Sequence, residues 1–189
     1  NTAYMSHGYG AFRAVSVADP RRPSPIGIKP PYLRSAARLW AADGLLFALY
    51  VTEREILDDR SYLETYDAAE PSGNTARQMI VGASRPSDFA ASDTHIYFAA
   101  GEGGVRIVPR GEGKETVYDP AWSANDVAVT GRYAYVASGD DGGHGGPGGS
   151  VHTIDIRDPA QPREVGALRV PQDTRKAEAD AVAAGGRYV

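Results

Sequence analysis

Three aspartates and one arginine occupy the same place in a repeated sequence pattern and could form a charged site. They are Asp88, Asp126, Asp180 and Arg38, each at the start of an apolar segment. Three converging carboxylates would repel one another, which raises the pKa of at least one of them unless a cation lies between them. The guanidinium of Arg38, a fork of five donors, is one such cation. The alternatives are a bound calcium ion, or aspartates that each cap their own local turn.

A glycine-rich stretch at 138–150, "SGDDGGHGGPGGS", supplies a second set of polar candidates, Asp140, Asp141 and His144. Calcium takes six to eight oxygen ligands, and this stretch offers few of them. The "GHGGPG" within it fits the spacing of a dinucleotide-binding loop. We reject that interpretation because a strand, not a helix, is expected to follow. The stretch is predicted to be a solvated loop available for binding, with a weak metal site as the alternative.

Composition excludes several classes of function. The 189 residues include no cysteine, which rules out disulfides, thiolate metal sites and cysteine nucleophiles. The net charge of −4 gives no basic footprint for nucleic acid. No apolar stretch approaches the roughly 20 residues of a membrane span. The motifs G-x-S-x-G and H-E-x-x-H are both absent, so a nucleophile elbow and that type of zinc site are unsupported.

The elements that must position these candidates are repeated along the chain. "FRAVSVADPRRPSPIG" (12–27) and "VHTIDIRDPAQPREVG" (151–166) align without a gap at an offset of 139 residues, with the same apolar alternation and the same Asp-Pro-x-x-Pro punctuation. "LETYDAAEP" (63–71) and "VRIVPRGE" (105–112) match more loosely. Four copies of one sequence pattern predict that the chain is an array of similar structural units.

Each unit is predicted to be two β-hairpins. A second pattern, "NDVAVTGRYAYVA" from Asn125, precedes the first, and it recurs from Ser87, Ala37 and Ala179 as two apolar runs around a tight turn. In the best unit we expect an antiparallel sheet of strands 126–130, 133–138, 151–157 and 163–170, in that order. Four-stranded units of about 40–50 residues are typical of the blades of an all-β propeller. The Ala-rich 174–186 favours a helix by propensity, but the repeat predicts that its second half is a strand.

The connections between second and third strands alternate in length. Those within 6–12 and 99–105 are short, and those within 49–63 and 137–151 are long. The long loops, 50–62 and 138–150, are expected on the same side as Asp88 and Asp126. Binding residues gather on loops held by a rigid scaffold, although drift in loop length costs little free energy and is the alternative explanation.

With these motifs, the sequence resembles the LVIVD-repeat family of bacterial β-propellers. The match is good at "VHTIDIRDP" with its flanks and at "FRAVSVADPRRPSPIG", and it is diluted in the two middle units. The resemblance implies a propeller that is exported or displayed on the cell surface, hence an extracytoplasmic location. It implies no catalytic motif.

The sequence allows two alternatives for the number of blades in the ring. We expect residues 1–189 to be a single β-propeller domain, or part of one, that begins and ends inside a blade. Four blades are then either a closed ring whose last blade is shared by both termini, or a window of a larger ring completed by the remaining blades of the same protein.

The function predicted from the sequence is a non-catalytic exported binding or scaffolding module for a protein or a surface polymer, without a resident cofactor. The alternative is a hydrolase or lyase with its site at the axial mouth of the propeller, because fold alone does not decide between binding and catalysis.

Overall fold

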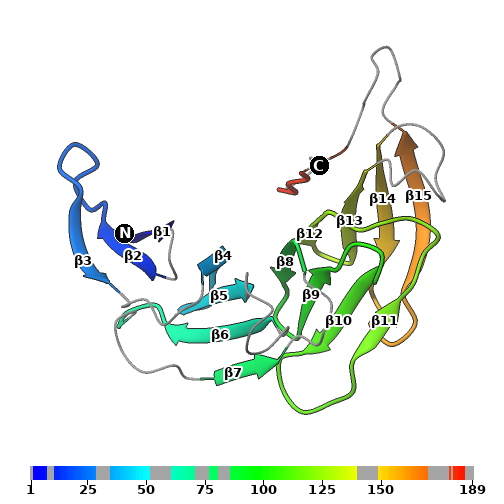
Figure 1. Ribbon diagram of the computed structural model, residues 1–189, viewed down its shortest axis with the longest axis horizontal. Helices are drawn as coiled ribbons and strands as arrows, with labels where there is room; N and C mark the ends of the chain where they lie inside the picture. Colours follow the sequence, from blue (N-terminus) through cyan, green and yellow to red (C-terminus); the bar gives the residue numbers. More distant parts are fainter. Residues whose placement is uncertain are drawn as a thin grey trace. The chain divides into compact units, whose positions relative to one another are not determined.

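A computed structural model describes residues 2–7, 11–28, 35–51, 61–70, 77–80, 86–139, 149–169, 179 and 181–185. These residues form strands and turns, with no helix among them. The chain divides into two compact units, 1–85 and 86–189, each built from two antiparallel sheets (Figure 1). The described part is therefore all-β, as the sequence predicted.

The first unit contains sheets 1 and 2. Sheet 1 has three strands in the order β1-β2-β3, and sheet 2 has four in the order β4-β5-β6-β7. Their bounds are β1 Thr2–His7, β2 Ala11–Ser16, β3 Ser24–Ile28, β4 Ser35–Ala42, β5 Leu45–Val51, β6 Tyr62–Asp67 and β7 Arg77–Ile80.

Aromatic packing joins sheets 1 and 2. Phe12 on β2 meets Tyr66 on β6 edge to face, with ring centroids 5.2 Å apart, and both side chains are buried. The Tyr4 hydroxyl on β1 donates a 2.6 Å hydrogen bond to the carbonyl oxygen of Ala68. The run from Leu46 to Tyr50 is buried throughout because both faces of this strand are covered, which explains its continuous apolar sequence.

The second unit contains sheets 3 and 4, each with four strands in chain order across the sheet (Figure 1). Their bounds are β8 Asp88–Ala91, β9 His95–Ala99, β10 Val105–Pro109, β11 Thr116–Tyr118, β12 Asp126–Thr130, β13 Tyr133–Ser138, β14 Ser150–Asp155 and β15 Arg163–Arg169. Sheet 4 has the four strands and the strand order predicted for the best repeat unit. The ends of β14 differ from the prediction, since this strand begins at Ser150 and ends at Asp155.

Sheets 3 and 4 meet along their inner strands. β8 packs beside β12, and Gly101 and Ala124 exchange two backbone hydrogen bonds of 2.8 and 2.9 Å. The Ser87 hydroxyl donates a 2.5 Å bond to the carbonyl oxygen of Asn125. These contacts join the residues that precede β12 to the end of sheet 3 at which β8 begins.

Tight turns join the strands of the hairpins. Asp43 and Gly44 both have positive φ, 53° and 72°, which is the backbone of a two-residue turn that matches the twist of the strands. Gly131 has φ 57° in the turn between β12 and β13. One expectation fails: of the predicted strand in the second half of 174–186, residues 179 and 181–184 have no regular structure and Gly185 forms only a bridge.

Candidate functional site

The strand register places the predicted charged residues at equivalent positions. Asp88 is opposite Ala99 in sheet 3, and Asp126 is opposite Ala137 in sheet 4. Arg38 is opposite Leu49 in sheet 2, after a bulge in β4. The innermost strand of each of these sheets therefore carries its charged residue at the same position in the strand register.

Asp126 uses its carboxylate to bind backbone amides. Oδ1 accepts a 2.9 Å bond from the amide of Val127, and Oδ2 accepts a 2.7 Å bond from the amide of Val182. The residue is 8% exposed. It therefore acts as a cap that also ties the 181–185 segment to β12, a contact that a purely local turn would not make.

Convergence of the four charged residues stays a prediction. Asp88 is partly buried and belongs to the same unit as Asp126, whereas Arg38 is exposed and belongs to the first unit. Asp180 lies outside the described residues. Among the residues that the structure describes, no three Asp, Glu or His side chains come together as metal ligands.

The ends of the predicted binding loop lie at the same end of sheet 4 as Asp126. Asp126 pairs with Ala137, and the next residue, Ser138, pairs with Ser150. The three polar candidates in between, Asp140, Asp141 and His144, fall outside the described residues. In sheet 2, Tyr50 pairs with Tyr62, so the other long loop begins and ends at the Arg38 end of its sheet.

We name this end of the second unit the inner-strand face and define it by Asp88, Glu102, Asp126 and Ser138. Glu102 belongs to the tight connection between β9 and β10, and its side chain is exposed. The inner strands of sheets 3 and 4 begin at this face.

A polar cluster that sequence reasoning missed lies just inside sheet 4, centred on His152 of β14. The ring is 8% exposed, and its Nε2 lies 3.2 Å from the Ser138 hydroxyl oxygen on β13. Its Nδ1 lies 3.3 Å from Oε2 of Glu164 on β15, close enough for electrostatic attraction but poorly aligned for a hydrogen bond.

Trp122 covers the imidazole from the segment that links the two sheets. The two rings are stacked, with centroids 3.9 Å apart and planes 16° from parallel. The indole Nε1 donates a 3.2 Å hydrogen bond to Oε2 of Glu164, the same oxygen that faces His152. Tyr118, at the end of β11, lies against the indole, with ring centroids 6.2 Å apart. Trp122 therefore packs between sheets 3 and 4.

Burial lowers the pKa of His152 below its ordinary value of 6.5. The neighbouring Glu164 carboxylate opposes the effect, and the Arg169 guanidinium adds to it. The lowered pKa favours the neutral imidazole at pH 7. The Ser138 hydroxyl and Nε2 share a hydrogen bond, and the tautomer of the neutral ring decides which of the two donates.

The order serine, histidine, carboxylate is also that of a hydrolytic triad, but the arrangement does not suit catalysis. Ser138 is 3% exposed, its hydroxyl lies 3.4 Å from the Ser150 carbonyl oxygen, and a stacked indole covers the base. A nucleophile must approach a substrate carbonyl closely, and a buried hydroxyl cannot. We assign the cluster to packing between sheets 3 and 4.

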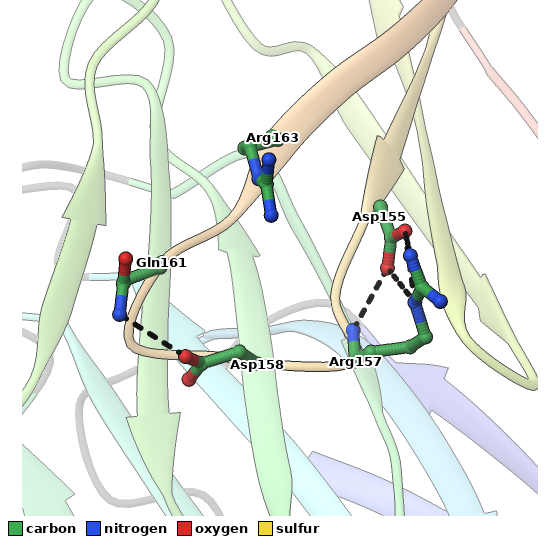
Figure 2. A pocket seen from close by; sticks show the side chains of 5 residues that line it. All are labelled: Asp155, Arg157, Asp158, Gln161 and Arg163. Carbon is green, nitrogen blue, oxygen red and sulfur yellow. Dashed lines mark hydrogen bonds and ion pairs between the residues drawn. The ribbon is translucent and has the colours of Figure 1, made fainter.

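A polar pocket of about 290 Å³ lies at the opposite end of sheet 4, in the turn between β14 and β15 (Figure 2). Arg157 and Asp155 point toward one another there, and their closest contact is 2.6 Å. Hydrogen bonding from Arg157 lowers the pKa of Asp155. Asp158 accepts a 3.1 Å bond from the Ala160 amide and a 3.3 Å bond from Gln161 Nε2. These side chains bond one another within the Asp-Pro-x-x-Pro turn of the repeat, which supports a structural role.

Comparison with known proteins identifies the repeat and the fold. The sequence profile described as "LVIVD repeat" matches residues 122–143, which confirms the predicted resemblance. No curated protein sequence matches the chain. The described segments contain no helix with the length and apolar character needed to cross a membrane.

Solved structures similar to this chain include natural and designed proteins. The designed protein Ika8 superposes with TM-score 0.63 at 13% identity, over 96% of this chain and 49% of its own. The β-propeller domain of Cps50 (Swd1) from Myceliophteria thermophila gives 0.62 at 10% identity, over 96% and 60%. BamB from Moraxella catarrhalis gives 0.55 at 14% identity, over 88% and 45%. The chain thus spans about half the length of Ika8 and of BamB, and the likeness shows the β-propeller fold.

Proposed function

Because this chain is a β-propeller that carries an LVIVD repeat, we propose that it is a non-catalytic, exported module that binds a protein or surface-polymer partner at its inner-strand face. The family resemblance supports the extracytoplasmic location and the general role in binding or scaffolding. The geometry of sheets 3 and 4 supports the choice of face.

The observation that carries the proposal is the shared register of the inner strands. Asp88 and Asp126 occupy the same register position in neighbouring sheets. Ser138, where the long glycine-rich loop begins, follows the residue that pairs with Asp126. Loops and charged residues displayed at one end of a rigid sheet array are the usual binding elements of such scaffolds. The opposite end of sheet 4 ends in a turn whose polar groups bond one another.

The rival function, a hydrolase or lyase at the axial mouth, has less support. The carboxylate of Asp126 is held by two backbone amides, which leaves it poorly placed as an acid or base. The Ser138 and His152 side chains are buried on the second and third strands of sheet 4, where a substrate cannot approach them.

Site-specific photocrosslinking in the cell envelope of the source organism tests the proposal. A benzophenone amino acid replaces Glu102 on the inner-strand face in one variant, and Ala160 in the opposite turn in the matched control. Both positions are exposed. We expect a discrete adduct from position 102 and none from position 160.

Adducts from both positions, from position 160 alone or from neither would refute the proposed face. The location is tested on the same cells, because a surface or periplasmic protein becomes accessible to added protease before the cytoplasmic membrane is broken. Cleavage only after lysis of that membrane would refute export.

A further inference from the structure

We propose that His152 is a proton-responsive joint: when its ring gains a proton, the 119–125 segment packs less tightly on sheet 4, and the inner-strand face that this segment leads into changes with it. This inference rests on the proposed binding function, because it concerns the regulation of the same face.

The joint connects directly to that face along the chain. Trp122 stacks on His152, and Ala124 forms the two-bond bridge to Gly101. The Asn125 carbonyl accepts the bond from Ser87, and the next residue is Asp126. Movement of the indole therefore reaches the start of β12 through only three residues of backbone.

The groups around the ring determine the sign of the response. Glu164 and Arg169 approach from β15, the Ser138 hydroxyl from β13, and the Trp122 indole from the 119–125 segment, with Tyr118 behind it. Glu164 favours an imidazolium, whereas Arg169 and the loss of water on burial disfavour it. The net result is a lowered pKa, so the packed joint binds a proton less tightly than an opened one. Acid therefore favours opening, and neutral pH favours packing.

A hydroxyl switch accompanies protonation. In the neutral tautomer that carries its proton at Nδ1, Nε2 accepts the hydrogen of Ser138. In the imidazolium, Nε2 becomes a donor, so Ser138 must accept there and turn its own hydrogen to the Ser150 carbonyl oxygen 3.4 Å away. The charge on His152 thus determines whether the Ser138 hydroxyl donates its hydrogen to the ring or to the Ser150 carbonyl oxygen of β14.

The first experiment needs no partner. In a Trp40→Phe background, Trp122 is the only tryptophan, and its emission wavelength is followed between about pH 8 and about pH 5 while NMR follows the His152 ring. We expect a red shift whose midpoint coincides with the pKa of His152 and lies below 6.5. The amide protection factor of Ala124 should fall over the same range, and that of Ile156, bonded to the Arg132 carbonyl oxygen at the far end of sheet 4, should not.

Three variants test the assignment. Glu164→Gln should lower the midpoint and Arg169→Gln should raise it, because their charges act on the imidazolium with opposite sign. His152→Gln should abolish the pH-dependent step. Should His152→Gln fail to fold, the opposite shifts of the other two variants still decide the question. A Trp122 signal that does not follow the His152 titration, or midpoints that do not shift in opposite directions, would overturn the joint.

The second experiment connects the joint to binding. The crosslinking yield from position 102 should fall in acid and should become independent of pH in His152→Gln. A joint that titrates while position 102 gives no adduct at any pH would refute the proposed function and leave the joint intact. Adducts that form equally well at both pH values would refute the coupling between them.

Discussion

Adding a single methyl group at Gly104 should lower the free energy of unfolding of this fold. It lies in the tight connection between β9 and β10 with φ +69°, and a Cβ there would lie 2.2 Å from the Tyr118 carbonyl oxygen and 2.9 Å from Pro120 Cδ. The left-handed backbone costs a non-glycine residue roughly 1–2 kcal/mol. Overlap with backbone that cannot move aside adds about 1–3 kcal/mol. Gly104→Ala should therefore lower the free energy of unfolding by about 2–5 kcal/mol, measured as a shift of the urea midpoint at constant slope.

Gly131 supplies the matched control for this prediction. Its φ is +57°, but nothing lies within 4 Å of the Cβ position. Gly131→Ala should therefore show the backbone cost alone, roughly 1–2 kcal/mol. The difference between the two variants measures the steric overlap with the Tyr118 carbonyl. Equal losses in the two variants would refute the argument, and a Gly104→Ala chain that fails to fold beside a folded Gly131→Ala chain would support it.

Substitutions at two further positions test the charged residues of the inner strands. Asp126→Ala should cost about 1–3 kcal/mol in urea unfolding, because the amides of Val127 and Val182 lose their acceptor, and Asp126→Asn should cost less because one oxygen remains. Arg38→Ala tests the predicted axial cluster: a buried counter-ion would cost on the order of 3–5 kcal/mol, and a loss below about 0.5 kcal/mol would exclude the cluster.

The repeat allowed much of the fold to be predicted, because it compares the chain with itself. The alignment of 12–27 with 151–166 places Phe12 on Val151, and the structure pairs Ser6 with Phe12 and Ala137 with Val151 in the same way. The alternating lengths of the loops follow from these pairs. Periodic apolar positions and turn residues are local signals, and each copy of the unit strengthens them.

The His152 cluster was missed because nothing in it is repeated. At the offset of 139 residues, the positions of His152 and Glu164 in sheet 1 are held by Arg13 and Pro25, which cannot reproduce the contact. A method that searches for what the copies share discards what is particular to one of them. The strand register could have indicated the cluster. Val136 pairs with His152, and Ile154 pairs with Glu164, so His152 and Glu164 lie on neighbouring strands near Ser138.

The one failed strand shows the limit of the same reasoning. The repeat equates the segment at 179–185 with an inner strand, and the segment does lie beside β12, since the Val182 amide bonds to Asp126. A strand also requires a ladder of backbone bonds to a partner, and the partner that the repeat assigns is the next apolar run, outside the described residues. Sequence equivalence therefore predicts where the segment lies but not its backbone conformation. The carboxylate of Asp126 is therefore one contact that holds the segment in place. We expect Asp126→Ala to lower the amide protection of Val182 as well as that of β12.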